Sequence, residues 1–144
     1  MPDTGRTGIL IGMPAQLNHT IVATKDARGA AAWLAELLGL PPPTQYAPFE
    51  CVHTANGVTL DFIDYDDPFE AQHYAFLVTE AEFDDIFERI VARKLPYWAD
   101  PALARAQEIN RNDGGRGVYF KNGDGHLLEL ITRPYGSGPR RPPS

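Results

Sequence analysis

The chain has 144 residues, of which 43% are hydrophobic and 22% are charged, and its formal net charge is −6. This composition is typical of a single globular domain with a hydrophobic core. Basic residues are scattered along an acidic chain, which disfavours a nucleic-acid partner because phosphate binding requires a concentrated basic face. No apolar run approaches the roughly 20 residues that cross a bilayer, so no membrane partner is expected.

The only cysteine is Cys51, which excludes an internal disulfide and a thiolate zinc cluster and predicts a small core residue. No basic segment followed by an apolar stretch opens the sequence, so a cytoplasmic location is expected. Residues 1–15 and the Pro-rich residues 134–144 are predicted to be flexible ends. They flank a single predicted domain over residues 16–133.

The first half of this domain, residues 16–66, begins with LNHTIVAT, a predicted strand rich in β-branched residues. Asp26 then predicts a helix N-cap, and Gly39 predicts the end of that helix. Two further strands, FECVHTA and VTLDFID, are separated by Asn56-Gly57, which is typical of a tight hairpin turn.

The second half, residues 71–133, repeats this order with the strand QHYAFLV, a helix, and the strands GRGVYF and HLLELIT. Thr79 and Glu82 have the spacing of a capping box at the start of the helix. The helix has an apolar face at helical spacing, formed by Phe83, Ile86, Phe87, Ile90 and Val91. The loop 99–115 is long enough to predict a lid or a substrate contact.

Matching residues recur at matching places in the two halves. His19 and His73 each lie in the first strand, and Asp61 and Glu129 each lie in the last strand. We therefore predict an α+β fold of two tandem βαβββ modules that form a curved sheet cup around a cavity for metal and substrate.

The same residues predict a metal site. If matching strands meet about a pseudo-twofold axis, His19, His73 and Glu129 converge on one cavity, with Asp61 as a further candidate. Glu129 is flanked by leucines, and a buried carboxylate requires a cation or a proton. Two imidazoles and one carboxylate on a shared face indicate a divalent-metal site with open positions.

The phrases LAELLG, QHYAFLV and GRGVYFKNGDGHLLELIT resemble the vicinal oxygen chelate superfamily over about residues 16–133. This group includes glyoxalase I, extradiol dioxygenases, fosfomycin-resistance enzymes and bleomycin-binding proteins. The resemblance implies paired βαβββ modules and a divalent metal ion (Fe(II), Mn, Zn, Ni or Co) held by His19, His73 and Glu129. It also implies a small-molecule substrate whose adjacent oxygens bind that ion, and a homodimer.

The resemblance assigns a catalytic role to Tyr119, which matches a tyrosine in the site of fosfomycin-resistance enzymes. Asp61 stands where glyoxalase I has a glutamate, so it is a fourth ligand, a base, a partner of a ligand or a surface residue. Ile21 replaces a threonine of the fosfomycin enzymes, which disfavours fosfomycin as substrate. His126 is predicted to be structural, whereas His53 is either a strand residue or an acid–base group of the cavity.

Three functions follow from this pattern. The first is a metal-dependent enzyme of the dioxygenase or glyoxalase type, acting as an oxidoreductase or as a lyase or isomerase. The second is an antibiotic-resistance enzyme of the fosfomycin-modifying type. The third is a non-catalytic drug-binding protein of the bleomycin-resistance type, which is disfavoured because such proteins generally lack the metal ligands.

Overall fold

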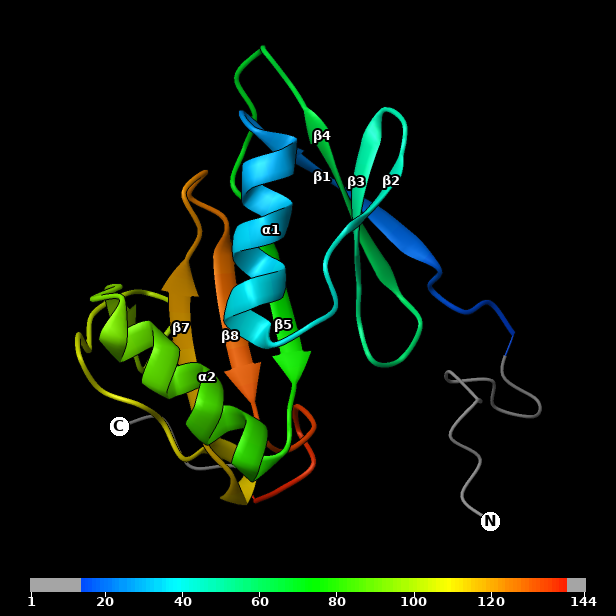
Figure 1. Cartoon of the computed structure of the whole chain (residues 1–144). Helices are drawn as coiled ribbons and strands as arrows, with labels where there is room; N and C mark the ends of the chain where they lie inside the picture. The colour runs from blue at the N-terminus through cyan, green and yellow to red at the C-terminus, as the bar shows by residue number, and fades with distance from the viewer. Residues whose placement is uncertain (1–13, 140–144) are drawn as a thin grey trace. The chain divides into compact units, whose positions relative to one another are not determined.

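The computed structural model describes residues 14–139 and divides the chain into two compact units, Met1–Phe69 and Glu70–Ser144. Residues 1–13 and 140–144, in the predicted flexible ends, lie outside the described residues. Each unit contains one helix and one sheet (Figure 1). Within the described range, neither helix has the length and hydropathy needed to span a bilayer.

The first unit is a four-stranded mixed sheet with one helix. The strand order is β1-β4-β3-β2, in which β1 and β4 are parallel and the other pairs are antiparallel. Its elements are β1 (His19–Thr24), α1 (Ala27–Leu38), β2 (Thr44–Tyr46), β3 (Phe49–His53) and β4 (Thr59–Asp64).

Helix α1 begins and ends where its capping residues predict. At the start, the Asp26 side chain accepts a hydrogen bond from the Gly29 amide. At the end, Gly39 adopts a left-handed φ of 72°, a conformation that is unfavourable for residues with a Cβ atom. The helix packs against β3, β4 and β1, and its buried Leu34 and Leu37 provide the apolar face.

The second unit repeats the arrangement with strand order β5-β8-β7-β6 and a parallel β5–β8 pair. Its elements are β5 (His73–Leu77), α2 (Glu80–Ala92), β6 (Tyr97–Trp98), the 3-10 turn η1 (Asn112–Gly114), β7 (Gly117–Lys121) and β8 (Leu127–Ile131). The prediction of an α+β fold with two βαβββ modules is confirmed, and neither sheet is closed.

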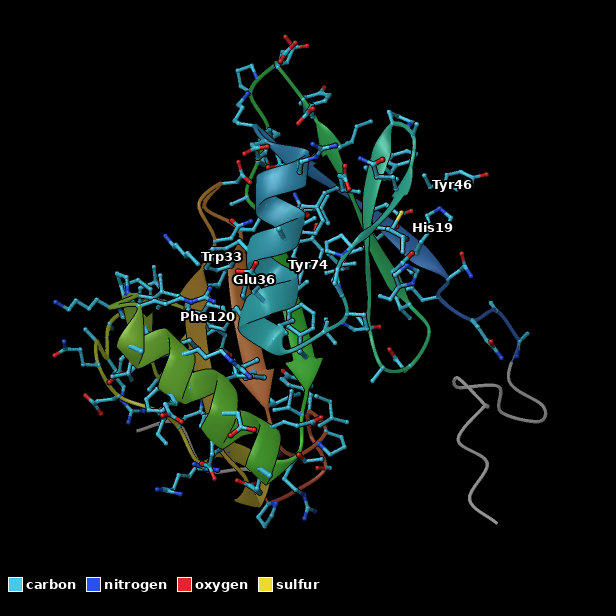
Figure 2. The ribbon with its side chains drawn as sticks, in the orientation of Figure 1. His19, Trp33, Glu36, Tyr46, Tyr74 and Phe120 are labelled. Carbon is cyan, nitrogen blue, oxygen red and sulfur yellow. The ribbon has the colours of Figure 1, made fainter. Side chains whose placement is uncertain are left out.

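Helix α2 begins with the predicted capping box, in which Thr79 and Glu82 exchange side-chain to backbone hydrogen bonds. It crosses the β7–β8 side of its sheet (Figure 1), where Phe120 is fully buried (Figure 2). The predicted apolar face is wrong at one position. Val91 is half-exposed because it lies at the edge of the buried stripe near the helix end.

The βαβββ prediction requires four strands per module, but no segment of the sequence was assigned to β2 or β6. They have only three and two residues, and they form by pairing with β3 and β7 rather than through a pattern of their own. The loop 99–115 is internally bonded, since the Asp100 carboxylate accepts hydrogen bonds from the Ala104 and Arg105 amides.

Candidate metal and substrate site

The last strand of the second unit places Glu129 beside two other candidate residues. Glu129 pairs with Ala75 of β5 and with Tyr119 of β7, and His73 lies two residues before Ala75 on the same face. The His73 Nε2 and Glu129 Oε1 atoms are 3.0 Å apart, although the Glu129 residue is only 8% exposed. The structure therefore brings His73, Glu129 and Tyr119 together.

The hydrogen-bond partners of His73 indicate which of its ring nitrogens carries the hydrogen. Its Nδ1 atom lies 3.0 Å from the Leu127 carbonyl oxygen, which can only accept, so the hydrogen is assigned to Nδ1. In the neutral ring, Nε2 then directs a lone pair at a carboxylate oxygen. Such an arrangement is stable only with a cation at the two atoms, either a proton or a metal ion.

The spacing of these two atoms suits a metal ion. Two ligands that lie about 2.1 Å from one ion at a right angle are about 3.0 Å apart. Imidazole and carboxylate are also the ligand types that divalent transition metals take in proteins. His73 and Glu129 therefore fit two positions of a divalent-metal site.

Tyr119 is the third member of this cluster and a proton donor. Burial, followed by the charge of Glu129 and a hydrogen bond to that carboxylate, raises the pKa of Tyr119 well above its usual range. The Tyr119 ring also stacks on His73 at a centroid distance of 5.9 Å. The phenol is consequently protonated at neutral pH and restrains both neighbours.

A cavity of about 180 Å³ in the second unit is lined by two members of this cluster, Tyr119 and Glu129. Its lining also includes the end of the predicted long loop at Asn112 and Asp113, and Tyr135 from the segment after β8. The sequence prediction missed Asp113 and Tyr135. The available signal was an aromatic residue within PYGSGP directly after the last strand.

The first unit has the same register but a different cluster. Asp61 pairs with Ile21 of β1 and Cys51 of β3, and it is 9% exposed. Burial, and then a hydrogen bond to Asp61, raises the pKa of the Cys51 thiol to about 11, so Cys51 is a buried donor. Among the described residues, the Asp61 Oδ1 atom is buried with no hydrogen-bond partner.

His19 is exposed on β1, and its Nδ1 atom lies 2.8 Å from Asn18 Oδ1. It projects on the side of the first sheet away from α1 (Figure 2). Within residues 14–139, no group of three or more His, Cys, Asp or Glu side chains forms a ready metal cluster. The trio of His19, His73 and Glu129 thus stays a prediction, with two members together in one unit.

The other two histidines have local partners. His126 is 1% exposed, its Nδ1 atom accepts a hydrogen bond from the Gln72 amide, and its ring contacts Tyr74 edge to face. His53 is exposed on β3, with its Nε2 atom 2.8 Å from the Thr44 hydroxyl oxygen. These contacts give His126 a structural role in the second unit.

No protein-family model matches the chain. Two solved structures are similar over nearly their whole length. The chain is 55% identical to the oxidase ChaP-H2, covering 88% of this chain and 100% of that one, with a TM-score of 0.85. It is 53% identical to the oxidase ChaP-H1, covering 85% and 99%, with a TM-score of 0.84. The chain belongs to the vicinal oxygen chelate superfamily.

A curated relative is the glutathione transferase FosA of Serratia marcescens, 29% identical over 127 residues, which cover 82% of this chain and 81% of that protein. The fosfomycin-resistance protein FosX from Listeria monocytogenes, solved with Mn(II) and sulfate, shares the fold at 24% identity and a TM-score of 0.62, covering 87% and 95%. The named activities of the oxidases and of FosA support an enzyme.

Proposed function

We propose that this chain is a divalent-metal-dependent oxidase or dioxygenase that binds adjacent oxygens of a small-molecule substrate. The observation that carries the proposal is the 3.0 Å approach of His73 Nε2 to Glu129 Oε1, a spacing that fits two ligands of one divalent ion. Identity above 50% to two oxidases supports oxidation rather than isomerisation as the reaction.

The proposed ligands are His19, His73 and Glu129, and the ion is Fe(II), Mn, Zn, Ni or Co. When bound, the ion supplies Lewis-acid polarisation of the substrate oxygens. The FosX structure that was solved with Mn(II) supports a metal ion in this fold. The buried Oδ1 atom of Asp61, which has no hydrogen-bond partner among residues 14–139, supplies a further acceptor in the first unit.

The remaining chemistry is assigned to side chains of the chain itself. Tyr119 keeps its proton at neutral pH, so it donates a hydrogen bond to Glu129 and holds that carboxylate in one orientation. No donor in the described part of the chain reaches the Asp61 Oδ1 atom, and we assign to Asp61 the role of the base that accepts a proton from a substrate hydroxyl. The Asp61 Oδ1 atom is buried away from water, which strengthens its interaction with a proton donor.

The second candidate is modification of an antibiotic of the fosfomycin type. The similarity to FosA and the presence of Tyr119 favour it. Ile21, which replaces a threonine of those enzymes in the resemblance, disfavours it. A non-catalytic binding protein is a weaker alternative, because both His73 and Glu129 are retained and paired.

Metal analysis and turnover assays test the proposal together. Protein purified without chelators is expected to contain about one divalent ion per chain, and the Fe(II)-loaded form is expected to consume oxygen with catechol substrates. Absence of a stoichiometric metal would contradict the proposal. Formation of a glutathione adduct from fosfomycin, without oxygen uptake, would favour the second candidate.

We also propose that the chain forms a homodimer, as the superfamily resemblance implies, and that it is cytoplasmic, as its single cysteine favours. Sedimentation at micromolar concentration should give twice the mass of the 15.9 kDa chain. A species at the monomer mass would contradict this part of the proposal.

A further inference from the structure

One wall of the cavity over Glu129 is made by the segment after β8, residues 134–139, which we call the strap. Asp113, in the turn before β7, fastens the strap by accepting two backbone hydrogen bonds. Its Oδ2 atom is 3.2 Å from the Gly136 amide nitrogen, and its Oδ1 atom is 3.1 Å from that of Gly138. Both oxygens of one carboxylate thus hold the strap.

The backbone is shaped for this contact. Asp113 has φ 58° and ψ 20°, a left-handed conformation that aspartate tolerates better than most residues. A Cβ at Gly138 would lie 2.3–2.5 Å from backbone atoms of Asp113, so no larger residue fits there. The strap is therefore seated directly on the Asp113 backbone, and its position depends on both residues.

The strap brings a large aromatic side chain to the cavity. Tyr135 lines it together with Tyr119 and Glu129, yet it is 84% exposed. At about 180 Å³, the cavity is smaller than the roughly 300–1,000 Å³ of typical small-molecule sites. A substrate bound at Glu129 would thus extend outward, and the Tyr135 ring offers a flat surface for that part.

We propose that Tyr135 is a specificity-determining residue that stacks on the ring of a flat aromatic substrate, and that Asp113 is the positioning residue that holds it there. The inference rests on the proposed function, because the oxygens of the substrate define its orientation at the His73–Glu129 end. Aromatic rings stack favourably on tyrosine, whereas a small aliphatic chelator does not reach it.

Two chelating probes separate ring stacking from metal binding, namely 2,3-dihydroxynaphthalene and acetohydroxamate. Dissociation constants are measured by calorimetry for metal-free and Mn(II)-loaded protein. Tyr135→Ala is expected to weaken naphthalenediol binding roughly five- to tenfold. It should change acetohydroxamate and Mn(II) binding by less than about twofold. Tyr135→Phe, which keeps the ring, should bind like the unsubstituted protein.

Asp113→Ala should reproduce the loss seen with Tyr135→Ala, and the double variant should lose no more than either single variant. Asp113→Asn, which keeps one acceptor and tolerates the left-handed backbone, should restore part of the affinity. Tyr46→Ala is the matched control, since Tyr46 is a 76% exposed tyrosine on β2 of the first unit. It should leave both probes unaffected.

Equal naphthalenediol affinity of Tyr135→Ala and the unsubstituted protein, or no binding of this probe to either metal form, would overturn the inference. Failure of the unsubstituted protein to bind Mn(II) is a separate result that contradicts the proposed function. In that case the metal-free measurements still decide whether Tyr135 stacks on the ring.

Discussion

The two units place a carboxylate at the same register position but surround it differently. In the second unit, Glu129 contacts His73 and Tyr119. In the first unit, Asp61 has the Cys51 thiol as its donor and one buried oxygen without a partner among residues 14–139. The second unit thus has the pair that we propose as metal ligands, whereas the first has the carboxylate that we propose as a base.

This difference follows from small changes in side-chain chemistry on one backbone plan. Aspartate is one methylene shorter than glutamate; Asp61 is hydrogen-bonded to Cys51 on the neighbouring strand, whereas Glu129 reaches the ring of His73. A phenol at 119 also offers a stronger hydrogen-bond donor than the thiol at 51. The two units share one backbone plan. The differences between Asp61 and Glu129, and between Cys51 and Tyr119, give the two carboxylates different partners.

The largest expected effect comes from substituting the two matched carboxylates, Glu129 and Asp61. Glu129→Gln should lower Mn(II) affinity about 1,000-fold, or about 4 kcal/mol, because a charged ligand is lost. Asp61→Asn should lower it by about tenfold at most. Calorimetric titration of metal-free protein measures both. Equal losses would show that the two carboxylates are equivalent ligands.

The next largest effect concerns the donors beside these carboxylates. Tyr119→Phe removes the hydrogen bond that orients Glu129 and should lower metal affinity or turnover about 10- to 100-fold. Cys51→Ala should change metal affinity by less than about threefold, because its partner Asp61 is not among the proposed three ligands. The pair of variants is compared by the same titration and by oxygen uptake. A larger loss in Cys51→Ala would reverse the roles of the units.

Substitution of His126, with His53 as the control, tests whether His126 stabilises the fold rather than binds metal. His126→Ala leaves the Gln72 amide without its buried acceptor and should lower the free energy of unfolding by about 1–3 kcal/mol. The folded protein should still bind Mn(II) as before. Urea denaturation measures the first effect and calorimetry the second. His53→Ala, at an exposed position, is the control, and loss of metal binding in His126→Ala would contradict its structural assignment.

The smallest effect tests the thiol of the first unit. The pKa of Cys51 is raised from 9.0 to about 11, so the folded protein should react with iodoacetamide about 100-fold more slowly than the unfolded chain at pH 8. Because the folded pKa is the higher one, the stability contributed by the protonated thiol is present below pH 9 and lost between pH 9 and 11. Rapid alkylation of folded protein at pH 8 would contradict the buried, protonated state.

The sequence predicted most of the fold because local signals agree with the tertiary structure. The caps at Asp26 and Thr79 mark the starts of both helices and Gly39 marks the end of α1, and the apolar neighbours of Asp61 and Glu129 indicate the buried strands β4 and β8. The strands β2 and β6 could not be located in the sequence because segments of three and two residues have no periodic pattern. Their pairing with longer strands stabilises them instead.

The candidate site was predictable only in part. The apolar neighbours of Glu129 indicated a buried carboxylate, and its contact with His73 follows from the parallel pairing of β5 and β8. Tyr135 and Asp113 could not be predicted, since their roles depend on the strap binding a distant turn. In the sequence, that strap reads only as a Pro- and Gly-rich end.

The most direct measurement is an anomalous-scattering map from crystals grown with Mn(II). The account predicts one peak per chain, within about 2.0–2.3 Å of His73 Nε2 and a Glu129 oxygen and ligated also by an imidazole nitrogen of His19. A map without a peak at His73 and Glu129, or with manganese bound elsewhere, would contradict it.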